Sequence, residues 1–126
     1  MKAKFFICEH CGNEVVMLHH SGVTPVCCGE PMKELVAHTK EAAYEKHIPV
    51  VVQKGNQVDV VVGSVIHPMV EAHFIKWIYL ETSKGGQFKK LAPNQEPKAS
   101  FTLTDEKLVA VYEYCNLHGL WAFEVK

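Results

Sequence analysis

Residues 48–62, IPVVVQKGNQVDVVV, carry the clearest secondary-structure signal in the chain. Two runs rich in valine, Ile48 to Gln53 and Val58 to Val62, flank the dipeptide Gly55-Asn56. Branched residues favour strands, and such a dipeptide between two apolar runs is typical of a two-residue hairpin loop. The stretch therefore predicts an antiparallel hairpin.

Short runs of the same kind continue to the end of the chain. No stretch shows a sustained helical period, and turn signals recur about every ten residues. The further predicted strands are Glu71 to Leu80, Gln87 to Leu91, Ser100 to Leu103, Leu108 to Tyr114 and Leu120 to Val125, with Gly85-Gly86 as a turn after the first of them. About seven short strands predict an antiparallel, immunoglobulin-like β-sandwich.

The first 36 residues differ from this pattern. They have little apolar bulk and are interrupted by Gly12, Gly22, Pro25, Gly29 and Pro31. Such a segment is expected to form short strands around tight turns, and one this small usually needs a metal ion or a partner to stay folded. We therefore predict a mostly β protein with two domains, residues 1–36 and 37–126. A polar linker or short helical turn is expected from His38 to Lys46.

Composition excludes several classes of protein. The chain has 126 residues, of which 48% are hydrophobic and 21% charged, so it can build a core. Its thirteen basic residues are all lysine, and its formal net charge is −1. Without arginine or a basic excess, nucleic acid is not an expected partner. The apolar runs are too short for a bilayer and the first residues lack a signal-peptide pattern, so we expect a cytoplasmic protein and no membrane partner.

Five cysteines and eight histidines in so short a chain indicate metal binding. The odd number of cysteines, with no export signal, argues against a disulfide framework. Four cysteines fall in the first 28 residues and one lies near the other end, whereas the histidines are spread over both halves. Two separate sites are therefore expected, one of sulfur and one mainly of nitrogen.

The expected sulfur site consists of Cys8, Cys11, Cys27 and Cys28. The first two form a C-x-x-C pair on one tight turn, and Gly12 permits the backbone that such a turn needs. Four sulfurs suit tetrahedral zinc or iron, so a purely structural zinc site is one interpretation. The adjacent Cys27 and Cys28 can bind one ion only with distorted geometry, which favours a redox-active iron. A disulfide between them would need a strained ring.

The expected nitrogen site combines segments at predicted strand ends and loops. Its candidate ligands are His47, His67, His73, Cys115 and His118. Four imidazoles and one thiolate suit iron or copper and leave one octahedral position free for a small molecule. A nucleophilic Cys115–His118 pair is the alternative for an enzyme. That alternative explains neither the other histidines nor the lack of an oxyanion-hole motif.

Taken together, these motifs resemble the desulfoferrodoxin family, the two-iron class of superoxide reductase, over essentially the full length. The first 36 residues resemble desulforedoxin through CEHCGN at residues 8–13 and CCGEPM at residues 27–32. The remainder resembles the catalytic domain. Its matching motifs are EKHIP at 45–49, HPM at 67–69, His73, and CNLHG at 115–119 followed by Trp121.

The resemblance implies a one-electron reduction of superoxide to hydrogen peroxide at the second of two mononuclear non-haem irons. It implies that the four N-terminal cysteines hold the first iron. In the second centre, the four histidines would be equatorial ligands and Cys115 the axial thiolate, with the sixth position open. Glu45 would occupy that position in the ferric state, and Lys46 would be a nearby cation that assists turnover.

The resemblance also implies a rubredoxin-like electron donor, and the small first domain makes a homodimer the expected assembly. Two other functions compete with the reductase. An electron carrier or metal-storage protein would hold iron only at the four cysteines, and a structural protein would hold zinc. The remaining histidines, His10, His19, His20 and His38, are expected at the surface. Trp121 is expected to pack beside the second site.

Overall fold

The computed structural model describes residues 2–40 and 42–125 and divides into two compact units. The smaller unit is Lys2–Val36, and the larger one begins at Ala37. Met1 and Lys126, which the predicted domain ranges include, lie outside the described residues, as does Glu41 in the predicted linker. None of the helices that the structure describes has the length and apolar character needed to cross a bilayer.

The smaller unit is built from five short strands in two antiparallel sheets. They are β1 (Phe5–Ile7), β2 (Glu14–Val16), β3 (Val26–Cys27), β4 (Glu30–Pro31) and β5 (Lys33–Leu35), paired as β2-β1-β5 and β3-β4. Its apolar core centres on Phe6, Cys8 and Met32. So small a core gives little stabilisation, and a bound metal ion is expected to contribute to folding.

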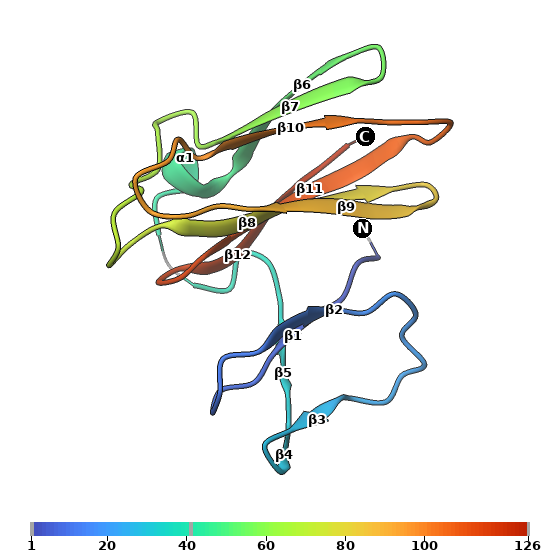
Figure 1. Ribbon diagram of the computed structural model, residues 1–126, viewed down its shortest axis with the longest axis vertical. Helices are drawn as coiled ribbons and strands as arrows, with labels where there is room; N and C mark the ends of the chain where they lie inside the picture. The colour runs from blue at the N-terminus through green and yellow to red at the C-terminus, as the bar shows by residue number, and fades with distance from the viewer. Residues whose placement is uncertain (1, 41, 126) are drawn as a thin grey trace. The chain divides into compact units, whose positions relative to one another are not determined.

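The larger unit is a sandwich of two antiparallel sheets, with strand orders β10-β7-β6 and β12-β11-β8-β9 (Figure 1). The strands are β6 (Pro49–Lys54), β7 (Gln57–Val62), β8 (Ile75–Thr82), β9 (Gly85–Lys90), β10 (Lys98–Thr102), β11 (Leu108–Cys115) and β12 (Gly119–Glu124). The prediction of a mostly β chain with an antiparallel, immunoglobulin-like sandwich is confirmed.

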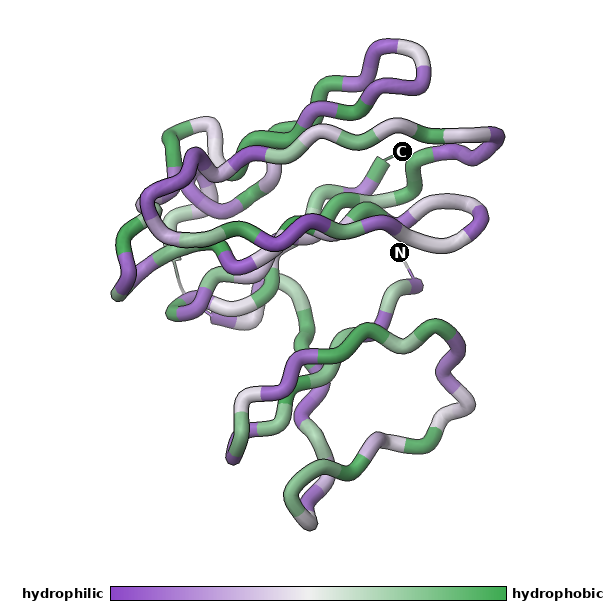
Figure 2. The backbone as a smooth tube through the Cα atoms, viewed as in Figure 1, coloured by the Kyte–Doolittle hydropathy of each residue, from purple (hydrophilic) through white to green (hydrophobic). Residues whose placement is uncertain are grey.

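The hairpin predicted at residues 48–62 forms as β6 and β7. Its register leaves Gly55-Asn56 as the two-residue loop. Val58, Val60 and Val62 are buried, whereas the residues between them are only partly covered. Figure 2 shows hydrophilic residues at the tip of this hairpin and apolar residues along the strands behind it. Burial of alternate side chains therefore fixes the face that β7 turns to the core.

Side chains from both sheets meet in one core cluster. It includes Ile78 of β8, Phe101 of β10 and Val111 of β11, and it extends to Cys115 at the end of β11. Burying each large apolar side chain stabilises the fold by about 1.5–3 kcal/mol. The packed sheets thus fix the end of β11, which carries Cys115, and the ends of the connecting segments that carry the candidate histidines.

The strand predicted to start at Glu71 begins only at Ile75. Before it, Val70 and His73 exchange backbone hydrogen bonds of 3.0 Å in an isolated bridge. These bonds turn the chain back on itself ahead of β8. The apolar pattern depends on side-chain type and does not reveal this local turn. The predicted strand therefore begins too early, at Glu71 instead of Ile75.

The prediction of a turn at Gly85-Gly86 is also wrong. Both glycines belong to β9, where Thr82 pairs with Gly85, and the loop is Ser83-Lys84. The side chain of Tyr79 covers Gly86, where any Cβ would collide with its ring. Gly86 is therefore needed for packing against an aromatic residue on the neighbouring strand.

Candidate metal centres

Five predicted ligands from separate segments of the larger unit converge on one point. Their nitrogen and sulfur atoms all lie within 4.8 Å of one another, and the residues are His47, His67, His73, Cys115 and His118. His47, His67 and Cys115 are buried, and the other two are half-buried. The structure therefore brings together every member of the expected nitrogen site.

The four imidazole rings are arranged around a square. Neighbouring centroids lie 4.6–4.9 Å apart and the rings are tilted by 81–83°, in the order His47, His67, His73, His118. The diagonal distance from His47 to His73 is 6.4 Å. Such a square suits four ligands that share one central ion.

The facing nitrogen atoms are spaced like ligands of one ion. His67 Nε2 and His118 Nδ1 each lie 3.1 Å from His47 Nε2. Two nitrogens bound at right angles, each about 2.1 Å from the ion, would be roughly 3 Å apart. Cys115 Sγ lies 3.9 Å from His118 Nδ1 and adds a fifth donor atom.

Hydrogen bonds at the outer nitrogens orient two of these rings. His47 Nδ1 lies 2.8 Å from the carbonyl oxygen of Ala43, and His67 Nδ1 lies 2.6 Å from that of Pro68. A carbonyl oxygen only accepts, so each Nδ1 donates a proton to it. Each Nε2 then keeps its lone pair for a metal ion, as in most metal-ligating histidines.

Burial favours the uncharged, metal-binding form of His47, His67 and His73. It lowers the pKa of His67 to about 4, and it is the main cause of the lowered pKa values of His47 and His73. Burial also raises the pKa of the Cys115 thiol, so its thiolate needs a cation nearby. The buried Nε2 of His73 has no hydrogen-bond partner among the described residues, and coordination to an ion at the centre would satisfy its lone pair.

The short helix α1 (Tyr44–His47) is held against the turn that follows β7. The backbone N–H of Val65 donates to the carbonyl oxygen of Glu45 at 2.9 Å. Gly63 has a φ of +87°, and a Cβ there would lie 2.8 Å from the carbonyl carbon of Lys46. This close approach explains the glycine. The spacing of the motifs did not reveal its role.

Glu45 and Lys46 are exposed beside the buried His47. Burial is the main cause of the lowered pKa values of His47 and His73, and the neighbouring His118 lowers them further. The positive charge of Lys46 makes the smallest contribution to lowering these pKa values. The ammonium group of Lys46 is therefore within electrostatic reach of the histidine cluster.

Asn116 fastens the Cys115–His118 turn to the segment that carries His73. Its side-chain oxygen accepts from the N–H of Phe74 at 2.9 Å, and its amide nitrogen donates to the carbonyl oxygen of Ala72 at 3.1 Å. The two bonds bracket His73 on both sides. The sequence shows Asn116 only as a residue between two ligands, because its partners lie on a distant segment.

The four N-terminal cysteines form the second cluster, with sulfur atoms within 4.8 Å of one another. Gly12, at a φ of +83°, donates its N–H to the carbonyl oxygen of Cys8 at 2.8 Å and closes the C-x-x-C turn. Cys28 has a φ of +52°, a conformation that is uncommon outside glycine. This left-handed backbone lets the neighbours Cys27 and Cys28 face one point, and both thiols are free.

The pKa values of the thiols in this cluster are shifted in opposite directions. The backbone N–H of Cys11 is the main cause that lowers the pKa of Cys8 to about 6, whereas the neighbouring thiols, Cys11 first, raise the pKa of Cys28 to about 12. A metal cation would stabilise all four thiolates at once, so the donor set fits an ion.

Two family models together match almost the whole chain. Residues 39–124 match the one described as Desulfoferrodoxin, and residues 2–35 match Desulfoferrodoxin, N-terminal domain. The chain belongs to the desulfoferrodoxin family. The resemblance carried by the sequence motifs is thereby confirmed.

Individual desulfoferrodoxins and superoxide reductases are similar to this chain. The desulfoferrodoxin of Nitratidesulfovibrio vulgaris is 48% identical, over 96% of this chain and 95% of its own. The superoxide reductase of Pyrococcus horikoshii is 39% identical, over 65% of this chain and 87% of its own. The crystal structure of the superoxide reductase from Treponema pallidum has a TM-score of 0.82 at 39% identity, and the match covers 98% of this chain and 100% of that one.

Each of the two matched desulfoferrodoxin segments contains one of the clusters. Four sulfurs suit a tetrahedral iron, and four imidazoles with one thiolate suit a second mononuclear iron. The predicted pair of iron cofactors is therefore confirmed for this member of the family.

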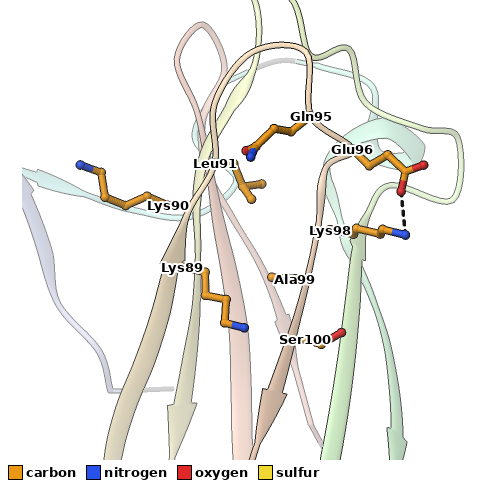
Figure 3. A pocket seen from close by; sticks show the side chains of 8 residues that line it. All are labelled: Lys89, Lys90, Leu91, Gln95, Glu96, Lys98, Ala99 and Ser100. Atoms are coloured by element: carbon orange, nitrogen blue, oxygen red, sulfur yellow. Dashed lines mark ion pairs between the residues drawn. The ribbon is translucent and has the colours of Figure 1, made fainter.

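A hollow of about 390 Å³ between the edge strands β9 and β10 contains none of the candidate ligands. Figure 3 shows its lysines, including Lys98, which pairs with Glu96 at 2.6 Å. Lys89 lies over the ring of Phe101, 5.3 Å from its centroid. Lysines on exposed sheet edges discourage pairing with another chain, which accounts for their presence.

Proposed function

We propose that this chain is a superoxide reductase that converts superoxide to hydrogen peroxide with one electron and two protons. The observation that carries the proposal is the square of four histidines with Cys115 beside it. Relatives and solved neighbours of the chain are superoxide reductases. When bound at this cluster, iron supplies the electron.

We assign the four histidines of the square and Cys115 as the residues that would hold the iron, four through an imidazole nitrogen and one through a thiolate. The alternating tilt of the rings and the 3.9 Å approach of Cys115 Sγ to His118 support this assignment. A buried thiolate donates electron density to its metal, and neutral imidazoles leave the ferrous site with net positive charge. Such a site attracts a small anion.

Lys46 guides superoxide to the cluster. It is exposed, and its charge reaches His47 and His73. Because the whole chain has a net charge of only −1, no strong overall field opposes this local one. We assign delivery of the product's proton to solvent water near Lys46.

With iron bound, Glu45 would supply a carboxylate ligand in the oxidised state. Its side chain is exposed one residue away from Lys46. The N–H of Val65 holds the backbone carbonyl of Glu45, so the carboxylate can move while the helix stays in place. Glu45 therefore protects the ferric state without being required for the reaction with superoxide.

The domain roles follow from the same assignment. Residues 1–36 are the desulforedoxin-like domain with the four-cysteine iron, and residues 37–126 are the catalytic domain. The two compact units and the two matched family models support this division.

A rubredoxin-like protein returns the electron, because each superoxide consumes one.

The five free thiols of the chain fit a location in the reducing cytoplasm. Exposed apolar side chains of the small unit, including Leu18, Val23 and Val26, favour burial against a second copy in a homodimer.

Metal analysis combined with the visible spectrum separates this function from its competitors. A reductase is expected to contain two irons, each with a ferric thiolate absorption band. Iron only at the four cysteines would indicate an electron carrier, and a colourless zinc protein would indicate a structural role. Consumption of superoxide without release of dioxygen then distinguishes a reductase from a dismutase.

A further inference from the structure

One ring of the histidine square contacts an aromatic residue outside the square. The centroid of the Trp121 ring lies 4.9 Å from that of His47, at an interplanar angle of 31°. Trp121 is fully buried, and its Nε1–H donates to the carbonyl oxygen of His118 at 3.0 Å. An indole has no lone pair to offer a metal ion. Trp121 therefore touches two candidate ligands without being one.

The contacts of Trp121 continue outward to solvent. The ring of Tyr44 meets Trp121 edge-on at a centroid distance of 5.1 Å, and Tyr44 is 60% exposed. Tyr44, Trp121 and His47 thus form an unbroken series of contacting rings from the surface to the cluster.

His38 holds the outer end of this series in place. Its ring lies 5.9 Å from Tyr44 and 5.0 Å from Trp121. Its backbone N–H donates to the carbonyl oxygen of Leu120 at 2.9 Å, and its Nε2 donates to that of Ala122 at 3.2 Å. His38 is exposed, as expected, and these two hydrogen bonds fix it to β12.

We propose that electrons from the external donor protein enter at Tyr44 and reach the iron through Trp121 and His47. This inference rests on the proposed function, since each superoxide leaves the centre one electron short. The donor, a reduced one-iron sulfur protein, loses one electron, and the ferric centre gains it. No bond within the ring series forms or breaks, and no proton moves, because the rings couple donor and acceptor and are not themselves oxidised. The carboxylate of Glu45, assigned to the oxidised state, leaves once the centre is reduced.

The arrangement separates the entry of electrons from the entry of superoxide. Tyr44 and Lys46 are two residues apart in α1, and side chains at that spacing do not face each other. A protein donor at Tyr44 therefore leaves the side of Lys46 open to the anion. The competing route for electrons leads from the donor directly to the cluster through the half-buried rings of His73 and His118.

The test measures reduction of the oxidised, iron-loaded protein by reduced rubredoxin in a stopped-flow instrument. At saturating rubredoxin, Tyr44→Leu is expected to lower the limiting rate about tenfold, which corresponds to about 1.4 kcal/mol in the barrier. Trp121→Leu should do the same, and Trp121→Phe should lower the rate less because it keeps a ring. The matched control is Phe88→Leu, which removes an aromatic ring that is also 60% exposed but lies in β9.

Further readouts distinguish a relay from a structural role. In Tyr44→Leu, the ferric absorption band, the midpoint potential and the rate of reduction by ascorbate should match the original protein. Ascorbate is small enough to reach the centre without the ring series. A variant that changed only the rubredoxin concentration at half-saturation would overturn the relay and leave Tyr44 as a docking contact.

Full-speed reduction of both Tyr44→Leu and Trp121→Leu would overturn the inference and assign entry to the exposed imidazole edges. If Trp121→Leu fails to load iron, Tyr44→Leu alone decides between the two routes. Failure of the proposed function is a different result, because the original protein would then not consume superoxide at all.

Discussion

The Nε2 atoms of His47 and His67 lie 3.1 Å apart, and both rings are buried. Each Nδ1 donates to a backbone carbonyl, so both Nε2 lone pairs face the same point. Two facing lone pairs repel each other unless a proton or a metal cation lies between them. Burial lowers the pKa values of both residues and so disfavours the proton. The pair is therefore adapted to a metal ion.

Replacing His67 with Ala should remove iron from the histidine cluster alone. Iron should fall from two ions to one per chain, because the variant lacks one of the four imidazole donors of the square. The absorption of the four-cysteine iron should remain. Metal analysis and the visible spectrum measure both effects. The converse variant is Cys28→Ser, which should lose iron from the four-cysteine cluster and keep the iron of the histidine cluster. A His67→Ala protein that retains both irons would show that His67 is not a ligand.

Replacing Lys46 with Ile should slow the association of superoxide by about tenfold, within the range expected for electrostatic steering. The rate should also become less sensitive to salt, because a charge that attracts the anion is gone. Pulse radiolysis measures the rate, and the iron spectrum should stay unchanged. Lys54→Ile, at an exposed lysine in the β6–β7 hairpin, is the control. Equal rates in Lys46→Ile and the original protein would refute steering by Lys46.

Replacing Glu45 with Ala should change the ferric absorption band of the histidine cluster and leave turnover largely intact. The reason is that Glu45 is assigned to the oxidised state only. Absorption spectra of the oxidised protein and a superoxide assay test the two parts separately. A ferric band that stays in place would remove Glu45 from the coordination sphere.

Replacing Gly63 with Ala should lower the free energy of unfolding by at least about 1–2 kcal/mol, the cost of left-handed backbone for other residues. It should also slow superoxide association, because a Cβ would push against the backbone of Glu45 and Lys46. Denaturant unfolding and stopped-flow kinetics measure the two effects. Gly55→Ala is the control: Gly55 has a φ of +59°, but a Cβ there meets nothing within 4 Å. If both variants lose the same stability and neither slows the reaction, Gly63 does not position α1.

The sandwich and the candidate ligands could be predicted because their signals are local. The hairpin follows from two valine-rich runs around Gly55-Asn56, and its register agrees. The ligands follow from uncommon residue types at recognisable spacings, such as Cys115 and His118 across one turn. Neither prediction required knowledge of which segments meet.

The supporting residues could not be predicted because they act between distant segments. Gly63 approaches the backbone of Glu45 and Lys46, and Asn116 binds the segment before β8. Trp121 was expected only to pack beside the site, and its ring contact with Tyr44 depends on how α1 docks on β12. Such contacts are set by the packing of the sheets and leave no pattern in the sequence.

A single turnover of the reduced, two-iron protein tests the central claim most directly. Superoxide is added in less than stoichiometric amount, and the peroxide formed, the dioxygen released and the oxidation of the histidine-bound iron are measured together. The account predicts that each superoxide oxidises one ferrous histidine centre and yields one hydrogen peroxide, with no dioxygen. Release of one dioxygen for every two superoxide ions, or a histidine centre that stays ferrous while superoxide persists, would contradict it.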